Sequence, residues 1–331
     1  MQFTIPYNNS DPESFIRVFE PYAEHIHSFY FGFPGLFATH NPYRKGIQSL
    51  IEDNANTYRF LQLCKGRFKT VLCINTPVYP LTIDDLYFKI LKELTPLSID
   101  YGLSAVNVAS PTIADLISKT FPNLEVQTSC NTYSFLPRQY QEWHDRFGVT
   151  VFNLPREALR SPQLLKDFKS LGFISKCIVN EGCIYGCPAN IEHACSFVMP
   201  EFAVHVLCDQ PNYRLSDIFR SNFIPPHRLD EFNGLLDIAK IAGRSFSTER
   251  ILQIFLAYLH RDPDADLRTL LHARSVKLLE ENHLSIRASD WPKKTLSCEC
   301  KECHTCSVCE KAMLKIIKRA SIDPATLTHP L

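Results

Sequence analysis

The chain has 331 residues, of which 35 are basic and 35 acidic, so its formal net charge is zero. This balance excludes a global electrostatic field that would favour nucleic acid or an anionic membrane. No run reaches the roughly 18 uninterrupted apolar residues of a membrane span, so we expect no membrane partner. With 45% hydrophobic residues the chain can bury a substantial core.

Short runs of β-branched and aromatic residues alternate with segments that carry apolar residues at helical spacing. The expected strands are 3–6, 27–31, 69–75, 105–108, 125–128, 149–153, 174–179 and 237–241. The expected helices are 84–94, 112–120, 137–147, 162–171 and 248–260, and we expect 220–227 to be a loop that crosses back towards the barrel. This alternation predicts parallel βα units of the α/β class, and a count near eight predicts a (β/α)8 TIM-like barrel. An open doubly wound sheet is the alternative, although the first βα turn has no Gly-x-Gly-x-x-Gly loop.

In such a barrel, the residues that follow each strand line one mouth, where barrel enzymes carry out their chemistry. The polar residues predicted to bind substrate there are Asn75, Ser129, Asn131, Asn153 and Asn180. The charged residues predicted to be catalytic are Arg156, Glu157, Glu181 and Arg244. An arginine can hold a carboxylate or phosphate with two hydrogen bonds, and a glutamate beside a low-dielectric pocket can transfer protons. Alternatively, Arg156 and Glu157 pair with each other as part of the barrel rim.

Thirteen cysteines are present, and most of them fall in two dense groups. The predicted metal ligands are Cys183, Cys187, Cys195 and Cys208 in the first group, and Cys300, Cys303, Cys306 and Cys309 in the second. The second group has the spacing Cys-x-x-Cys-x-x-Cys-x-x-Cys, which is typical of iron–sulfur binding. We therefore expect one or two [4Fe-4S] clusters, with zinc as the alternative at the C-terminal cysteines. Cys177 and His193 compete with Cys208 for the fourth position of the first cluster.

A disulfide framework is the competing explanation of so many cysteines. The cysteine number is odd, and the first residues lack the basic start and apolar run of a signal peptide. A reducing cytoplasm therefore fits the chain best. After Trp291-Pro292 the composition changes to lysine, glutamate and cysteine. We accordingly predict a barrel domain over 1–285 and a cysteine-rich metal-binding segment over 286–331.

Four segments resemble the collagenase-like peptidase family U32, over roughly residues 70–258. One of them is Val106-Asn107-Val108-Ala109-Ser110-Pro111, a strand that ends before a helix. Another is the strand segment 122–131, which has a Pro-x-hydrophobic-x-hydrophobic-x-x-Ser pattern. The more distinctive two contain Arg156-Glu157 and Lys240-Ile241-Ala242-Gly243-Arg244. The resemblance implies a barrel-like fold and a cysteine-bound [4Fe-4S] cluster that serves oxygen-independent hydroxylation of RNA bases or quinone precursors. The segment after the seventh strand departs from the family, because the usual His-Gly is replaced by Asn180-Glu181-Gly182-Cys183.

Together these observations favour an iron–sulfur-dependent oxidoreductase or transferase. The expected chemistry is redox or group transfer, such as hydroxylation or sulfur insertion, on a small molecule, a peptide or an RNA base. An electron donor or a partner subunit would complete the reaction. One alternative is a peptidase-like hydrolase, although the chain has no His-Glu-x-x-His and no Gly-x-Ser-x-Gly. Another is a non-enzymatic iron–sulfur or zinc scaffold.

Overall fold

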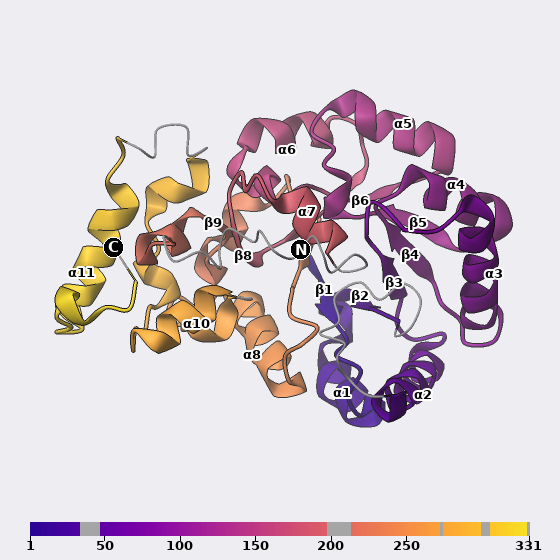
Figure 1. Cartoon of the computed structure of the whole chain (residues 1–331), viewed down its shortest axis with the longest axis horizontal. Helices are drawn as coiled ribbons and strands as arrows, with labels where there is room; N and C mark the ends of the chain where they lie inside the picture. Colours follow the sequence, from indigo (N-terminus) through magenta and orange to yellow (C-terminus); the bar gives the residue numbers. More distant parts are fainter. Residues whose placement is uncertain (34–46, 197–212, 272–273, 299–304, 330–331) are drawn as a thin grey trace.

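Eight parallel strands close into a barrel in the computed structural model, which describes residues 1–33, 47–196, 213–271, 274–298 and 305–329 (Figure 1). Around the barrel the strand order is β1-β10-β7-β6-β5-β4-β3-β2. The strands are β1 (Gln2–Pro6), β2 (Ile26–Phe31), β3 (Thr70–Ile74), β4 (Ala105–Val108), β5 (Glu125–Thr128), β6 (Val151–Asn153), β7 (Ile174–Ile178) and β10 (Ile238–Lys240). The predicted (β/α)8 barrel is therefore confirmed, and each expected strand is present within two residues at either end.

Helices connect successive strands and cover the outside of the barrel (Figure 1). They are α1 (Pro12–Phe19), α2 (Ile47–Cys64), α3 (Ile83–Ile99), α4 (Pro111–Thr120), α5 (Pro137–Phe147) and α6 (Pro162–Lys169), and α8 (Thr248–Leu259) follows the last strand. The helices α1, α4, α5 and α6 begin with proline. Proline is favoured at the first helical position because the amide hydrogen it lacks would have no partner inside the helix. The helix α5 ends at Gly148, whose φ of 67° is left-handed and suits glycine.

Alternating residues of the barrel strands point to two different environments. Val106, Val108 and Phe152 belong to the main hydrophobic cluster between the barrel and its helices. Ala105 instead forms a second cluster with Tyr30, Val71 and Cys73 inside the barrel. The same alternation directs Asn107 and Asn153 into the interior, so the barrel lumen near its C-terminal end is polar.

An excursion interrupts the barrel between β7 and β10. It contains β8 (Asn180–Ile184), α7 (Asn190–Cys195), the 3-10 helices η6 (Leu215–Arg220) and η7 (Pro226–Phe232), and β9 (Ser221–Phe223). β8 and β9 pair antiparallel as a separate two-stranded sheet with an irregular register. The expectation of a loop over 220–227 was wrong for most of these residues, because Arg220 ends η6, Ser221–Phe223 form β9, and Pro226 begins η7. A strand of three residues with an irregular register has no alternating pattern that sequence analysis can detect.

The C-terminal elements pack on this excursion at the end of the molecule away from α1 to α5 (Figure 1). They are α9 (Leu267–Leu270), α10 (Arg274–Glu281), the 3-10 helices η8 (Ala288–Asp290) and η9 (Lys293–Ser297), α11 (Val308–Arg319) and η10 (Pro324–Thr326). Trp291 contacts the rings of Phe219 and Phe223, with centroids 5.1 and 4.7 Å away. Met313 and Ile317 of α11 belong to the same hydrophobic cluster as the barrel helices. One core therefore extends across the predicted boundary near residue 286.

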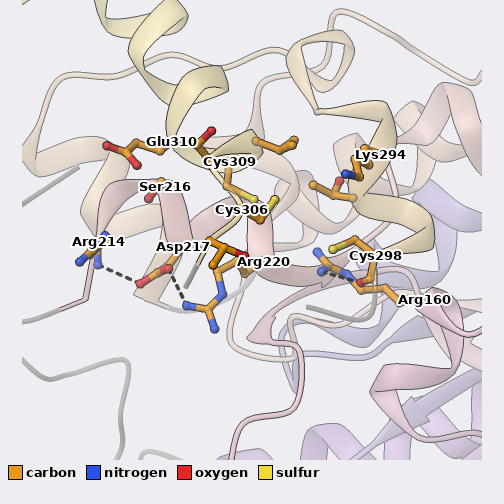
Figure 2. A pocket seen from close by; sticks show the side chains of 14 residues that line it. Arg160, Arg214, Ser216, Asp217, Arg220, Lys294, Cys298, Cys306, Cys309 and Glu310 are labelled. Atoms are coloured by element: carbon orange, nitrogen blue, oxygen red, sulfur yellow. Dashed lines mark hydrogen bonds and ion pairs between the residues drawn. The ribbon is translucent and has the colours of Figure 1, made fainter. Parts of the chain in front are cut away.

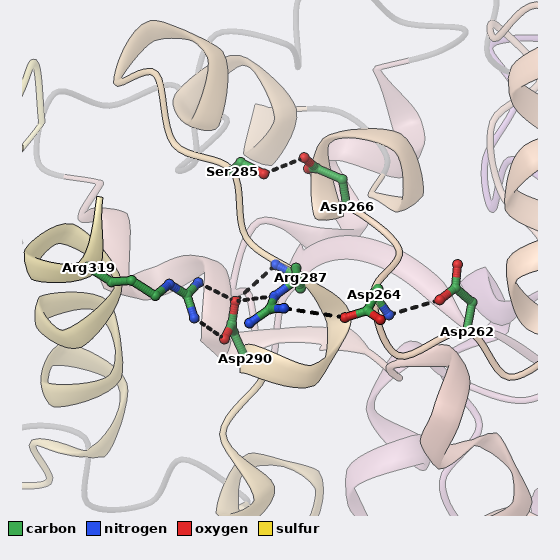
Figure 3. A network of polar contacts seen from close by, with 7 residues as sticks. All are labelled: Asp262, Asp264, Asp266, Ser285, Arg287, Asp290 and Arg319. Atoms are coloured by element: carbon green, nitrogen blue, oxygen red, sulfur yellow. Dashed lines mark hydrogen bonds and ion pairs between the residues drawn. The ribbon is translucent and has the colours of Figure 1, made fainter. Parts of the chain in front are cut away.

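A set of polar contacts joins the turns of this C-terminal region (Figure 3). The Arg287 guanidinium lies 3.5 Å from the Asp264 carboxylate, and the Ser285 hydroxyl donates to Asp266 at 2.7 Å.

In the part of the chain that the structure describes, no helix has both the length and the apolar character needed to cross a bilayer.

Candidate functional site at the barrel mouth

Two of the predicted catalytic residues form a buried ion pair at the C-terminal mouth of the barrel. Arg156 begins the 3-10 helix η3 (Arg156–Arg160) directly after β6, and Glu181 lies in β8. The Arg156 Nε donates to Glu181 Oε2 at 3.0 Å, and the two side chains are 14% and 6% exposed. Water screens this pair weakly, so both charges act strongly on whatever binds beside them.

Thiol and phenol groups surround the Arg156 guanidinium. Burial by itself would lower the pKa of Arg156, but Cys130, Glu181 and Cys183 together raise it well above its ordinary value. Burial raises the pKa of the nearby Tyr133 hydroxyl. Arg156 is thus a permanent cation that can bind a negative group, or stabilise negative charge on a neighbouring thiol.

Another part of the mouth is built from Tyr30 of β2 and the end of β10. The Tyr30 hydroxyl donates to the Ile241 carbonyl at 2.8 Å. The Lys240 ammonium lies 4.3 Å from the centre of the Tyr30 ring, and the Arg244 guanidinium lies 5.9 Å from it. Gly243, with φ of 122°, makes the turn between them, and a Cβ at this position would collide with the Phe246 ring. The glycine therefore permits the tight turn that carries Arg244 to the mouth.

The predicted asparagines divide into two groups. The Asn131 side chain donates to the Asn75 carbonyl at 2.8 Å, and the Asn131 backbone amide donates to Ser129 Oγ at 3.2 Å. These three residues are therefore adjacent. The Asn153 side chain donates to the Thr128 carbonyl at 2.6 Å. The Asn180 side chain instead binds the backbone of two other segments. It donates to the carbonyls of Ala242 and Leu270 and accepts from the Ala242 amide. We therefore place Asn75, Ser129, Asn131 and Asn153 at the mouth, and assign Asn180 to the support of β10.

Glu157 is adjacent to Arg156 in sequence but makes a separate contact. Its carboxylate accepts a hydrogen bond from Asn190 Nδ2 of α7 at 3.1 Å. Arg156 is paired with Glu181, and Glu157 is in contact with the excursion. The alternative in which Arg156 and Glu157 pair with each other is not what the structure contains.

Among the described cysteines of the first group, Cys183 lies in β8, Cys187 follows this strand, and Cys195 is the last residue of α7. Cys183 and Cys187 are partly exposed, and Cys195 in α7 is buried. Asn222 Nδ2 donates to the Cys183 carbonyl at 3.3 Å, which fixes the backbone at this thiol. Burial raises the pKa of Cys195. Cys177, the competing ligand, lies in the hydrophobic core, where burial raises its pKa well above the ordinary thiol value.

The predicted metal-binding sets are only partly within the described residues, because Cys208, Cys300 and Cys303 lie outside them. Among residues whose placement is described, no three Cys, His, Asp or Glu side chains are grouped as a metal site. Both metal-binding predictions therefore stay predictions.

Three of the C-terminal cysteines line a pocket of about 610 Å³ between the excursion and the start of α11 (Figure 2). They are Cys298, Cys306 and Cys309. Arg160, Arg220 and Lys294 contribute cationic groups to the same pocket. Arg160 is 2% exposed, and its guanidinium donates to the carbonyls of Phe219 and Ser221 at 2.8 and 2.6 Å. Sequence analysis missed Arg160, because nothing in the string distinguishes it from a surface arginine.

Sequence analysis also missed the lysines inside the barrel. Lys176 in β7 is 1% exposed and donates to Gln127 Oε1 at 2.9 Å. Burial, followed by the nearby Lys240 ammonium, lowers the pKa of Lys176 to about 7. The neighbouring strands β7 and β10 thus place two lysines close together, and the Glu125 carboxylate, which accepts from Gln127 Nε2 at 2.7 Å, lies near Lys176. The alternation of Ser175, Lys176 and Cys177 was the available signal, since it places the lysine on the inner face.

No protein-family model matches the chain. The uncharacterized protease MJ1657 of Methanocaldococcus jannaschii is 27% identical to it over 247 residues, which are 68% of this chain and 73% of that protein. The solved structure of the U32 peptidase Mk0906 matches with a TM-score of 0.50 and 15% identity, over 73% of this chain and 93% of that one. The chain resembles the U32 peptidases. The resemblance predicted from the sequence is thereby confirmed, and the likeness to Mk0906 concerns the fold.

Within this U32-like barrel, residues from the family-like motifs lie at the mouth. Arg156 comes from the Arg-Glu motif, and Lys240 and Arg244 come from the Lys-Ile-x-Gly-Arg motif. Arg156 pairs with a residue of the excursion, whereas Lys240 and Arg244 lie over Tyr30. The segment that departs from the U32 pattern therefore completes the mouth next to motif residues.

Proposed function

We propose that this chain is a U32-type enzyme whose substrate binds at the barrel mouth, and that a [4Fe-4S] cluster held by Cys183, Cys187, Cys195 and Cys208 lies beside it. The reaction class would be redox or group transfer on a small molecule, peptide or RNA base. The observation that carries the proposal is the buried Arg156–Glu181 pair, with Cys130 and Cys183 close to the guanidinium. Buried charges with specific partners in a barrel mouth are a feature of functional sites.

The chemistry of the donor set supports an iron–sulfur cluster over a hard cation, because thiolates are soft ligands. Cys183 and Cys187 lie on the excursion, next to the mouth, and Cys208 is outside the described residues. The described thiols therefore supply part of a ligand set. A bound cluster would supply one-electron redox capacity.

The protein's own groups have separable roles in this proposal. Arg156 and Arg244 bind an anionic group of the substrate, since guanidinium groups match carboxylate and phosphate geometry. Glu181 keeps Arg156 oriented and can hold a proton next to the substrate. Asn75, Ser129 and Asn131 orient polar groups of the substrate at the rim. The basic residues around Cys306 and Cys309 suit a second, thiolate-bound metal site, which carries net negative charge.

A peptidase is the second candidate, because the printed names of MJ1657 and Mk0906 are those of a protease and a peptidase. In this reading the Cys130 thiol, which is 5% exposed and lies near Arg156, would be the nucleophile. The two candidates differ in their need for iron, so one set of measurements separates them.

The test is the iron, sulfide and zinc content of protein purified without oxygen, together with its optical spectrum. Under the proposal the wild type contains iron and matching sulfide, and Cys183→Ser and Cys187→Ser lose the mouth cluster. Cys64→Ala is the matched control, because Cys64 is buried in the core away from the mouth. It should keep its iron per folded chain. Iron-free protein that hydrolyses a mixed peptide library, and loses this activity in Cys130→Ala, would replace the proposal by the peptidase.

A further inference from the structure

Two side-chain amides inside the barrel are held by one backbone oxygen. Asn107 of β4 and Asn153 of β6 are 1% and 2% exposed. Asn107 Nδ2 donates to the Thr128 carbonyl at 3.0 Å, and Asn153 Nδ2 donates to the same oxygen at 2.6 Å. Because a carbonyl only accepts, these contacts fix which end of each amide is the nitrogen.

The other end of each amide is an acceptor that has no donor in the part of the chain that the structure describes. Asn107 Oδ1 and Asn153 Oδ1 are buried and have no hydrogen-bond partner among the described residues, and Asn75 Oδ1 at the end of β3 shares this property. Buried polar atoms are almost always paired, and exceptions call for a ligand, a water or a catalytic role. Both asparagines lie near the C-terminal ends of their strands, at the floor of the mouth.

The charges around this floor restrict what can bind there. Asn153 is the register partner of Lys176, and Asn107 is the register partner of Gln127, which accepts from Lys176. Lys240 lies on the neighbouring strand β10, and its register partner on β7 is Ile178. A cationic ligand would meet these ammonium groups, and the nearby Glu125 carboxylate is already paired with Lys69 and accepts from Gln127, so we expect the donor at the amide oxygens to be neutral.

We propose that Asn107 and Asn153 form the floor of the substrate site and accept hydrogen bonds from a neutral –NH₂ group of the substrate. This inference rests on the function proposed above and names the substrate class for the same site: a molecule that carries a carboxamide or a conjugated amino group. One –NH₂ group has two N–H donors, one for each of the two amides that the Thr128 carbonyl holds. Asn107 was missed as a site residue, because it lies within a predicted strand.

The test uses three small probes with one ring and different donors: benzamide, N,N-dimethylbenzamide and benzylamine. Dissociation constants are measured by ligand-observed NMR on the full chain. We expect benzamide to bind at least tenfold more tightly than the dimethylated amide, which has no N–H, and than the cationic benzylamine. Equal binding of benzamide and its dimethyl derivative, or no benzamide binding up to the solubility limit, overturns the proposal.

Leucine substitutions at the two asparagines supply the second measurement. Asn107→Leu and Asn153→Leu each remove an unpaired buried oxygen while the other asparagine still donates to Thr128. We expect each to weaken benzamide binding at least fivefold and to leave Tm unchanged or raise it. The control is Asn282→Leu, because Asn282 is buried but has both ends of its amide paired, with Leu278 and Thr328. It should lower Tm and leave benzamide binding unchanged.

Unchanged benzamide affinity in both leucine variants overturns the inference, as does a crystal structure with ordered water on both oxygens and the probe elsewhere. If a variant fails to fold, the comparison of probes on the wild type still decides. Probe binding requires neither iron nor turnover. Loss of the probe preference in an active iron enzyme would remove this inference alone, whereas an intact preference in an iron-free, inactive protein would remove the proposed function alone.

Discussion

Arg319 donates to both carboxylate oxygens of Asp290, at 2.7 and 2.5 Å, and so joins the end of α11 to the turn η8 (Figure 3). The Asp290 carboxylate also accepts from the Arg287 amide at 3.1 Å. The hydrogen bonds from Arg319 are the first cause of a lowered pKa at Asp290, which burial opposes. The contact links α11 to the turn η8, and Trp291, which follows this turn, packs against Phe219 and Phe223.

Arg319→Gln should loosen α11 and leave the barrel unaffected. We expect a fall in Tm of about 2 °C, because the pair is partly exposed, together with faster amide hydrogen exchange in α11. Since the folded pKa of Asp290 is lowered, its stabilisation is complete above the ordinary aspartate pKa and is lost as pH falls through the lowered value. The difference between wild type and variant should therefore vanish in acid. Arg67→Gln, which removes an exposed pair with Glu20, is the control. Equal effects of the two substitutions on α11 exchange would contradict this assignment.

Lys176→Met should stabilise the protein, and more so at pH 6 than at pH 10. The folded pKa of about 7 lies below the ordinary lysine value of 10.5, so the unfolded chain binds more protons between these two pH values. The contribution of Lys176 to the free energy of unfolding therefore rises with pH in that window. Below pH 7 the buried ammonium destabilises the fold by its full amount. Thermal unfolding at both pH values measures the effect. A stabilisation that does not depend on pH would mean that packing, and not charge, is responsible.

A double-mutant cycle on Arg156 and Glu181 should reveal strong coupling. Arg156→Met leaves a buried carboxylate and should cost about 3–5 kcal/mol in the free energy of unfolding, whereas Arg156→Met combined with Glu181→Leu should cost less. Urea unfolding of the four proteins gives the coupling energy. The exposed pair Arg138–Glu142 serves as the reference, where about 0.3–0.5 kcal/mol is expected. Coupling as small as in the reference would mean that the mouth is well solvated.

Arg160→Lys should destabilise the protein by about 2–4 kcal/mol although the charge is kept. A lysine cannot reach the Phe219 and Ser221 carbonyls together with the geometry of a guanidinium fork. The excursion should then exchange amide hydrogens faster than the barrel strands. Arg214→Lys, at an exposed position on the same pocket, is the matched control. Similar unfolding free energies for the two variants would count against the proposed role of Arg160.

The barrel could be predicted from the sequence because each strand has its own local signal. Ala105–Val108 and Glu125–Thr128 are short runs that contain β-branched residues between helical segments, and their bounds agree with the structure. The two-stranded sheet of β8 and β9 could not be predicted, because its short strands are separated by a long stretch of chain and depend on tertiary contacts. The helix α11 was not predicted, although its buried residues Met313, Ile316 and Ile317 follow helical spacing.

For the mouth, sequence analysis identified residues but not their partners. Arg156, Glu181 and Arg244 are at the mouth, as expected from their positions after strands. The pairing of Arg156 with Glu181, and not with its neighbour Glu157, depends on where β8 leaves the barrel. The lumen residue Asn107 was missed because its strand is short, and Lys176 was missed although the alternation of its strand places it on the inner face.

The strands β7 and β10 are hydrogen-bonded neighbours, although the whole excursion lies between them in sequence. The chain leaves the barrel wall and returns to it at adjacent places, so β7 and β10 close the barrel by direct pairing, and Asn180 of the excursion supports the end of β10. Cys183, Cys187 and Glu181 are all carried on it. The proposed site groups and the barrel scaffold therefore lie on separate stretches of the chain. In an ancestral lineage, or in a designed chimaera, one excursion could be exchanged for another, and the barrel would acquire a different set of ligands without any change in its strand registers.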